Sequence, residues 1–270
     1  MSTRTNRSPG EIALIALAML LATLLLAVPL IYIFVTALRE GFAIYFANIL
    51  NPNTLHAIFL TVMTAVIVVP INMAVGVCVA WLVTRFKFRG KQLLISFIEL
   101  PASVSPIVAG VVYLFLYGGQ GLLGPTLQGA GIQIMFTPLA IVLVSLFVTA
   151  PFVARELIPL MSQQGGEDEE AALSLGANGW QMFWFVTLPN IRWALLYGAV
   201  LTNARAMGEF GAVSVVSGAI RGQTNTLPLQ INLLFNDFNI TDAFAAASTL
   251  ALIAVATLII KTMLESRQHV

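Results

Sequence analysis

The sequence has little charge and almost no cysteine. Asp, Glu, Lys and Arg make up 9% of its 270 residues, whereas 59% are hydrophobic and the mean hydropathy is +0.91. Soluble domains have about 25% charged and about 45–50% apolar residues, so we expect an all-α integral membrane protein. The single cysteine, Cys78, lies within an apolar run. It excludes a disulfide framework and is expected to be a small buried hydrophobe.

Several motifs that carry chemistry are also missing. The two histidines, His56 and His269, are isolated and no zinc-type Cys/His spacing occurs, so no metal site is expected. There is no G-x-x-x-x-G-K-[ST] phosphate loop, so the chain cannot bind ATP by that route. We therefore expect no catalytic residues and no bound cofactor. The 13 Lys and Arg nearly balance the 12 Asp and Glu, and no nucleic-acid partner is expected.

Six apolar stretches are long enough to cross a bilayer, which takes about 20 residues. The first follows Arg4 and Arg7 and is interpreted as an uncleaved anchor, because it is too long for a signal-peptide core and lacks a small-residue cleavage site. Prolines inside the second, third and fourth stretches indicate bent helices packed as a bundle. A single transmembrane domain over residues 1–270 is predicted, with spans at about 12–38, 55–83, 93–117, 136–160, 191–217 and 243–264.

The basic residues are distributed unevenly between the two sides of these spans. Six crossings place both termini on one side. The opposite side would hold only Arg39 and Arg221, and Arg205 would lie within the fifth span. The positive-inside rule then predicts that both termini are cytoplasmic. The ten residues on that side are Arg4, Arg7, Arg85, Lys87, Arg89, Lys91, Arg155, Arg192, Lys261 and Arg267.

The cytoplasmic loop between the fourth and fifth spans, residues 161–190, contains a run of acidic residues. Glu167–Glu170 would complement the positive end of a helix dipole and so predict a helix start, and Gly176 predicts its end. Asn178 opens a capping-box pattern for a second short helix that runs to Pro189. Apolar side chains on both helices leave two interpretations open: a solvated connector, or a docking surface for a partner.

The loop carries a recognisable spacing. Glu170-Ala171-Ala172, Gly176 and Val186-x-Leu188-Pro189 follow E-A-A-x3-G-x9-I-x-L-P, with Val186 in place of the more frequent Ile. This pattern resembles the signature loop of permease subunits of bacterial ABC importers. The resemblance implies a type I ABC importer permease fold whose loop between spans four and five forms coupling helices seated in a groove of a cytoplasmic ATPase. It implies ATPase-coupling roles for Glu170, Ala171, Ala172, Gly176, Leu188 and Pro189.

A second resemblance extends from about residue 28 to the last span. The segment A-R-A-x-G-E-F-G-A, Ala204–Ala212, is similar to oxyanion permeases of the sulfate and molybdate branch, and LHAIFLTVM and TLPLQI are similar to W-type subunits of sulfate/thiosulfate importers. This implies a non-enzymatic pore subunit in the bacterial inner membrane that works by alternating access, with ATP and Mg used by a partner. The implied partners are an ABC ATPase dimer, a T-type sister permease, a periplasmic sulfate/thiosulfate-binding protein and membrane lipid.

The fifth span holds a deep pair of opposite charges, Arg205 and Glu209, at i,i+4 spacing on one helix face. Intramembrane charges are candidates for function, but each partner can also simply neutralise the other. A carboxylate beside a pore arginine would weaken attraction for a dianion, so the residues favour a structural pair, and a pore role stays open.

Other functions are compatible with the residues. A molybdate/tungstate-type permease is one, because a binding protein would select the anion. An ion-coupled secondary transporter is another, although the arginine four residues from Glu209 disfavours a proton carrier. A membrane scaffold that recruits the loop's partner is a third. Six spans are few to enclose a pore, so a dimer is expected, either homodimeric or heterodimeric.

Overall fold

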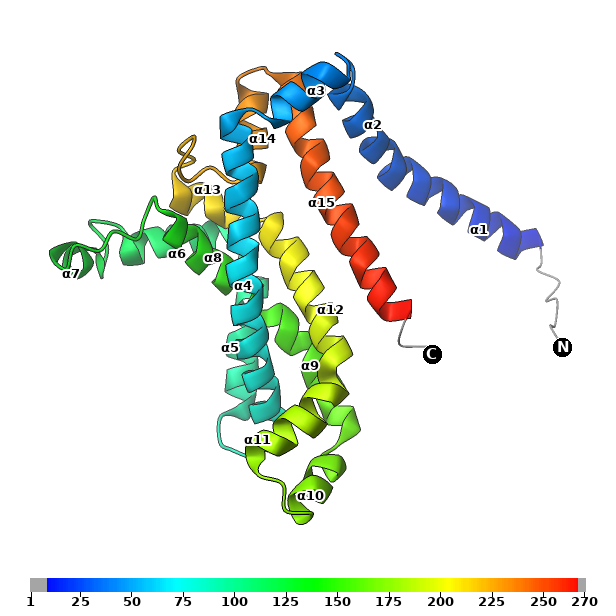
Figure 1. The fold of residues 1–270 in the computed structure, drawn as a ribbon, viewed down its shortest axis with the longest axis vertical. Helices are drawn as coiled ribbons and strands as arrows, with labels where there is room; N and C mark the ends of the chain where they lie inside the picture. The colour runs from blue at the N-terminus through cyan, green and yellow to red at the C-terminus, as the bar shows by residue number, and fades with distance from the viewer. Residues whose placement is uncertain (1–8, 267–270) are drawn as a thin grey trace.

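The computed structural model describes residues 9–266, which form helices and no strands. In Figure 1, α4, α9 and α12 run side by side toward the end that carries α10 and α11, while α1 extends away from the rest and α2 packs against α15 at the opposite end. The elements are α1 (Pro9–Ala22), α2 (Val28–Ala37), α3 (Phe42–Ile49), α4 (Pro52–Arg85), α5 (Lys91–Ser103), α6 (Pro106–Tyr117), α7 (Gly124–Gly129), α8 (Pro138–Thr149), α9 (Pro151–Gln164), α10 (Glu167–Ser174), α11 (Gly179–Met182), α12 (Leu188–Met207), α13 (Gly211–Ser217), α14 (Leu227–Asn236) and α15 (Ile240–Ser266), with π-helical turns η1 (Thr23–Ala27) and η2 (Phe183–Thr187).

Four described helical stretches are long and apolar enough to cross a membrane. They overlap the first, second, fourth and sixth expected spans and cover Gly10–Ala37, Pro52–Arg85, Pro138–Gln164 and Ile240–Thr257. The all-α class predicted from composition is confirmed. The count of six spans is not, because the third and fifth expected spans are both interrupted.

The third expected span is broken at a proline. α5 and α6 are bent by 106° relative to each other, so the pair counts as at most one broken span. Pro106 is the first residue of α6, and Ser105 before it has φ −58° and ψ 132°. Proline disfavours the α conformation in the preceding residue. A proline expected to bend one helix therefore separates two.

The fifth expected span is divided as well. α12 ends at Met207 and α13 begins at Gly211, and neither is among the described helices long and apolar enough to cross. The two breaks lie side by side, because a Cβ atom built on Gly211 would be 3.2 Å from the Cβ of Pro106. Arg205 and Glu209 consequently do not share one continuous helix, contrary to expectation, since Glu209 follows the end of α12.

Close packing at the centre of the column formed by α4, α9 and α12 requires glycine at two positions. A Cβ atom on Gly76 of α4 would lie 2.5 Å from Cγ1 of Val153, and one on Gly198 of α12 would lie 3.1 Å from its Cα. Val153, on α9, is fully buried between these two helices. Glycine at both positions lets the three backbones approach closely enough to bury an apolar core around Val153.

One expectation about α4 is wrong. Cys78 was expected to be buried, but it is exposed. It lines an open, mainly apolar cavity of about 470 Å³ together with Trp81 of the same helix and Trp180 of α11. An apolar residue on a helix that packs on only one side is exposed whenever it faces away from the bundle, and an apolar sequence run cannot reveal that direction.

Candidate functional site: the loop between α9 and α12

The acidic helix forms as the sequence predicts. α10 begins with Glu167 and ends at Ser174, and Gly176 follows it with φ +90°. The N–H of Gly176 donates to the carbonyl of Leu173 at 3.0 Å, and the N–H of Ala177 to that of Ala172 at 3.1 Å. These two bonds make a Schellman motif, whose left-handed residue is normally glycine. Local chemistry thus sets the sharp turn after α10.

The capping box is also confirmed. The N–H of Gln181 donates to Oδ1 of Asn178, and the N–H of Asn178 donates to Oε1 of Gln181, both at 2.9 Å. The helix that it starts is not a separate short helix, however. α11 continues through η2 directly into α12, so Pro189 lies in the first turn of α12. Proline cannot donate a hydrogen bond to the preceding turn, and that turn, η2, is π-helical.

The positions carried over from the family pattern lie mostly on the outside of this loop. Glu170, Ala171, Gly176 and Pro189 are exposed, and Ala172 and Leu188 are half-buried. Between α10 and α11 lies an open hollow of about 460 Å³. It is lined by Ala172, Leu175, Gly176, Ala177, Gln181, Met182, Phe185 and Val186. Leu175 and Phe185 are 89% and 78% exposed, which is apolar surface of the kind that a partner covers.

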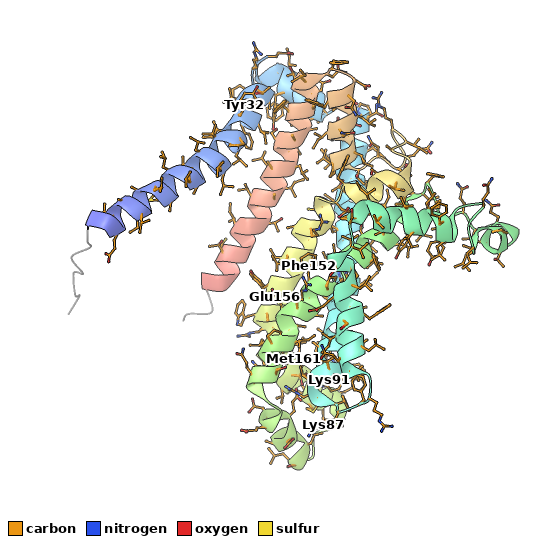
Figure 2. The ribbon with its side chains drawn as sticks, turned by 180° about the vertical axis from the view of Figure 1, so that it is seen from behind. Tyr32, Lys87, Lys91, Phe152, Glu156 and Met161 are labelled. Carbon is orange, nitrogen blue, oxygen red and sulfur yellow. The ribbon has the colours of Figure 1, made fainter. Side chains whose placement is uncertain are left out.

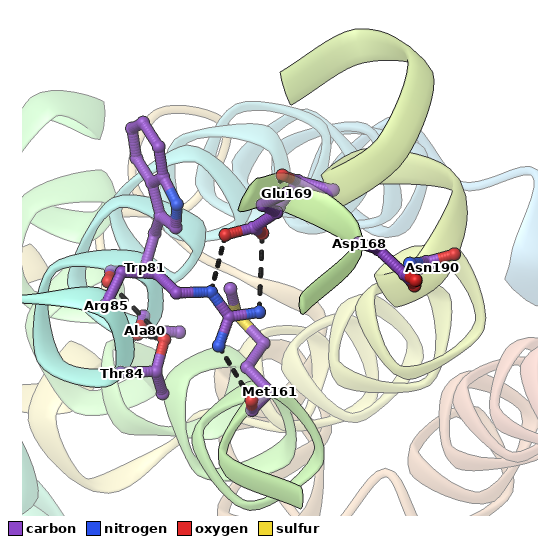
Figure 3. A network of polar contacts seen from close by, with 9 residues as sticks. Ala80, Trp81, Thr84, Arg85, Met161, Asp168, Glu169 and Asn190 are labelled. Carbon is purple, nitrogen blue, oxygen red and sulfur yellow. Dashed lines mark hydrogen bonds and ion pairs between the residues drawn. The ribbon is translucent and has the colours of Figure 1, made fainter. Parts of the chain in front are cut away.

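A second set of contacts holds the same loop to the bundle from inside (Figure 3). Nε of Arg85, the last residue of α4, donates to Oε2 of Glu169 at 2.6 Å, and its Nη2 donates to Oε1 at 3.3 Å. Nη1 donates to the carbonyl of Met161 on α9 at 2.9 Å. The hydroxyl of Thr187 in η2 donates to Oε1 of Glu169 at 2.8 Å.

This network was missed at the sequence level. Glu169 was interpreted as one of four acids that start a helix, but it is buried, whereas Glu167, Asp168 and Glu170 are exposed. Its partner, Arg85, lies 84 positions earlier in the chain. A single sequence carries no signal for a pairing over that distance, and the four acids look equivalent until α10 is docked.

The loop lies at the same end of the molecule as two of the basic residues. Lys87 and Lys91 lie toward the end that carries α10, as Figure 2 shows, whereas α3 and the C-terminal end of α2 lie at the opposite end (Figure 1). Arg39 follows α2, so it belongs to the opposite end, as the charge distribution predicted. Arg4, Arg7 and Arg267, which also entered that prediction, lie outside the described residues.

Arg205 and Glu209 meet at the break between α12 and α13. Nη2 of Arg205 lies 3.0 Å from Oε2 of Glu209, while Oε1 of Glu209 accepts the N–H of Ala212 at 3.0 Å. Glu209 thus caps the start of α13 with one oxygen and pairs with arginine through the other. Arg205 lies at the edge of this break and is partly exposed, whereas Glu209 is buried.

Comparison with known proteins matches the chain to one family model. Residues 72–270 match the model described as "Binding-protein-dependent transport system inner membrane component". The sulfate transport system permease protein CysW of Escherichia coli K12 is 57% identical over 258 residues, which cover 96% of this chain and 89% of that protein. The CysT permease of the same strain is 32% identical over 259 residues, or 96% and 94% of the two chains.

A solved structure has a similar fold. It is the crystal structure of a bacterial alginate ABC transporter in complex with an alginate-pentasaccharide-bound periplasmic protein. The TM-score is 0.74 at 18% identity, and the match covers 93% of this chain and 91% of that one. At this identity the similarity establishes the fold, which agrees with the ABC permease fold expected from the sequence.

Proposed function

The chain belongs to the family of binding-protein-dependent transport system inner membrane components, and on that premise we propose that it is the permease subunit of an ATP-driven sulfate and thiosulfate importer. The observation that carries the proposal is the 57% identity, over 96% of this chain, to a sulfate transport system permease. Relatives of this kind are multi-pass membrane proteins that form a pore and are not enzymes.

Physical chemistry requires an energy source for this substrate. Sulfate is a dianion, and each charge moved inward against 100 mV, inside negative, costs about 2.3 kcal/mol. Two charges cost about 4.6 kcal/mol, so a passive pore would hold the internal concentration roughly a thousandfold below the external one. The sequence has no phosphate loop of its own. ATP and Mg are accordingly assigned to a separate cytoplasmic ABC ATPase dimer.

The remaining partners follow from the same proposal. The chain pairs with a T-type sister permease, because a relative named CysT matches nearly its full length at lower identity than CysW does. A periplasmic binding protein delivers sulfate or thiosulfate to the opposite face, as a periplasmic protein is bound in the alginate transporter of similar fold. Both termini and the α10–α11 loop lie in the cytoplasm, and membrane lipid covers the apolar outer surface, including Gly10–Ala37.

We assign the outer surface of the loop between α9 and α12 as the binding surface for the ATPase. The coupling positions are Glu170, Ala171, Ala172, Gly176, Leu188 and Pro189. The small side chains permit close approach, the hollow between α10 and α11 offers a concave apolar surface, and Glu170 supplies an exposed charge. Closure of the ATPase dimer on ATP would draw this loop inward and open the bundle toward the binding protein.

Arg205 is assigned to the anion path and Glu209 to the structure of the break. Glu209 is buried and fixed by the N–H of Ala212, so its carboxylate belongs to the start of α13. Arg205 is a charge partly exposed at the edge of the break. A charge at membrane depth needs contact with water or with protein groups. A water-filled path for an anion would provide that contact for Arg205.

Complementation in cells tests this proposal. A bacterial strain that lacks its own sulfate and thiosulfate permeases is supplied with this chain, its sister permease, the ATPase and the binding protein. We expect growth on sulfate as the sole sulfur source, lost when either this chain or the ATPase is omitted. Growth that does not require the ATPase would contradict an ATP-driven importer and favour an ion-coupled transporter.

A further inference from the structure

We propose that Arg85 and Glu169 form the joint through which movement of the coupling loop reaches the membrane helices. The two residues are positioning residues: they act through the surface around Glu170 and need not touch the ATPase or the anion. This inference rests on the proposed function. Arg85 and Glu169, here called the inner anchor, lie outside the family's signature spacing. They hold the loop to the bundle on the side opposite the docking surface.

The contacts of Arg85 join the ends of several elements. Its guanidinium comes from the last residue of α4. Two of its nitrogens hold the carboxylate of Glu169 on α10, and the third holds the carbonyl of Met161 on α9. Thr187 adds η2, which leads into α12. One carboxylate and one guanidinium therefore link the loop to α4, α9 and the start of α12.

The geometry resists rotation. A guanidinium bound through two nitrogens to both oxygens of a carboxylate fixes the relative orientation of the two side chains, which a single point charge does not. The side chains of Arg85 and Glu169 are only 15% and 10% exposed, so water does not readily replace either partner. A displacement of α10 is thus passed to the end of α4 and is not absorbed by side-chain motion.

Two consecutive residues of α10 have different roles: Glu169 contacts the bundle, and Glu170 belongs to the docking surface. Glu169 points into the bundle and Glu170 is exposed, as expected for helix positions 100° apart. A polar side-chain contact of a neighbouring acid, Nδ2 of Asn190 to Oδ2 of Asp168 at 3.1 Å, is exposed. A partner that moves Glu170 therefore moves Glu169 with it, because both belong to one two-turn helix.

The experiment measures coupling directly. The complete complex, with sister permease and ATPase, is reconstituted in liposomes with the binding protein outside and ATP inside, and uptake of radiolabelled sulfate and release of phosphate are measured together. The variants are Glu169→Gln, which removes the charge at nearly constant shape, Arg85→Lys, which keeps the charge but loses the fork, and the double variant. Asp168→Asn is the matched control, an acid in the same turn with an exposed contact.

We expect each single variant to keep the ATPase bound in unchanged ratio and to lower sulfate imported per ATP by about tenfold, within the factors of roughly 5 to 150 typical of coupling between sites. The double variant should be no worse than either single variant, because the two side chains act as one unit. Asp168→Asn should equal the wild type.

Provided that the wild-type complex imports sulfate with ATP, either of two results would overturn the inference. One is an unchanged ratio of sulfate to ATP in both single variants. The other is loss of the bound ATPase in proportion to loss of uptake, which would mean that the pair only holds the loop in shape for docking. A wild-type complex without ATP-dependent uptake would instead contradict the proposed function itself.

Discussion

Arg205 and Glu209 form an ion pair of 3.0 Å whose two members lie in very different surroundings. The arginine side chain is 37% exposed and the glutamate 1%. Glu209 is further tied to the N–H of Ala212 at the start of α13. The pair is therefore not a symmetric neutralisation of two charges. Glu209 stabilises the start of α13 after the break, and Arg205 places a cation at the edge of the break.

Neutralising Arg205 should impair transport. Interactions with charged groups contribute about 1.5–3 kcal/mol, so Arg205→Gln is expected to lower sulfate uptake by roughly ten- to a hundredfold, and Arg205→Lys by less. Uptake into liposomes by the complex, at equal protein amount, measures this.

Glu209→Gln is the matched variant for Arg205. It keeps an oxygen that can accept from Ala212 but removes the opposing charge, so uptake should stay near the wild-type level if Arg205 serves the anion. Equal loss of folded protein in the glutamine variants of both residues would instead assign the pair to structure alone.

Reversing the charge at Glu170 should release the ATPase. Glu170→Lys places a cation on the exposed face of α10, and we expect the purified permease pair to retain much less ATPase than the wild type does. Glu167→Lys changes another exposed acid at the start of the same helix and controls for net charge. Equal retention of the ATPase by both variants would remove Glu170 from the docking surface.

The turn at Gly176 should depend on backbone conformation more than on space. A Cβ atom there meets nothing within 4 Å, but φ is +90°, and L-residues other than Asn and Asp adopt left-handed conformations at a cost of about 1–2 kcal/mol. Gly176→Asn should therefore retain more uptake than Gly176→Val. If the two substitutions reduce uptake equally, bulk at the docking surface is what matters.

The contact of Val153 with Gly76 gives a test of the core. Gly76→Ala would push a methyl group to 2.5 Å from Cγ1 of Val153, and overpacking of this kind costs about 1–3 kcal/mol. Thermal unfolding in detergent should show a lower midpoint for Gly76→Ala, and Gly76→Ala with Val153→Ala should recover little of the loss, because the Cβ atom that alanine keeps at position 153 would still lie 2.6 Å from the added methyl group. Full recovery in the double variant would mean that the clash involves only the Cγ atoms of Val153.

Features set by near neighbours could be predicted from the sequence. The end of α10 at Gly176 and the capping box of Asn178 depend on residues within a few positions, and both are found as expected. The broken spans could not be predicted as such. Pro106 is compatible with either a bend or a break, and the gap after Met207 arises inside an apolar stretch.

The inner anchor was beyond sequence reasoning for a different reason. Glu169 differs from the acids beside it only by facing the bundle, and Arg85 looked like one more basic residue on the cytoplasmic side. Their pairing exists because α4 ends beside the start of α10, which is a property of tertiary packing. Periodicity and capping rules describe single elements and do not place two of them together.

ATP-dependent sulfate uptake by the reconstituted complex tests the central claim most directly. The complex of this chain, its sister permease and the ATPase is placed in liposomes with the sulfate-loaded binding protein outside. We predict accumulation of sulfate against its gradient that requires ATP inside and persists when an uncoupler abolishes the membrane potential and the proton gradient. Uptake that persists without ATP and stops with the uncoupler would contradict the account.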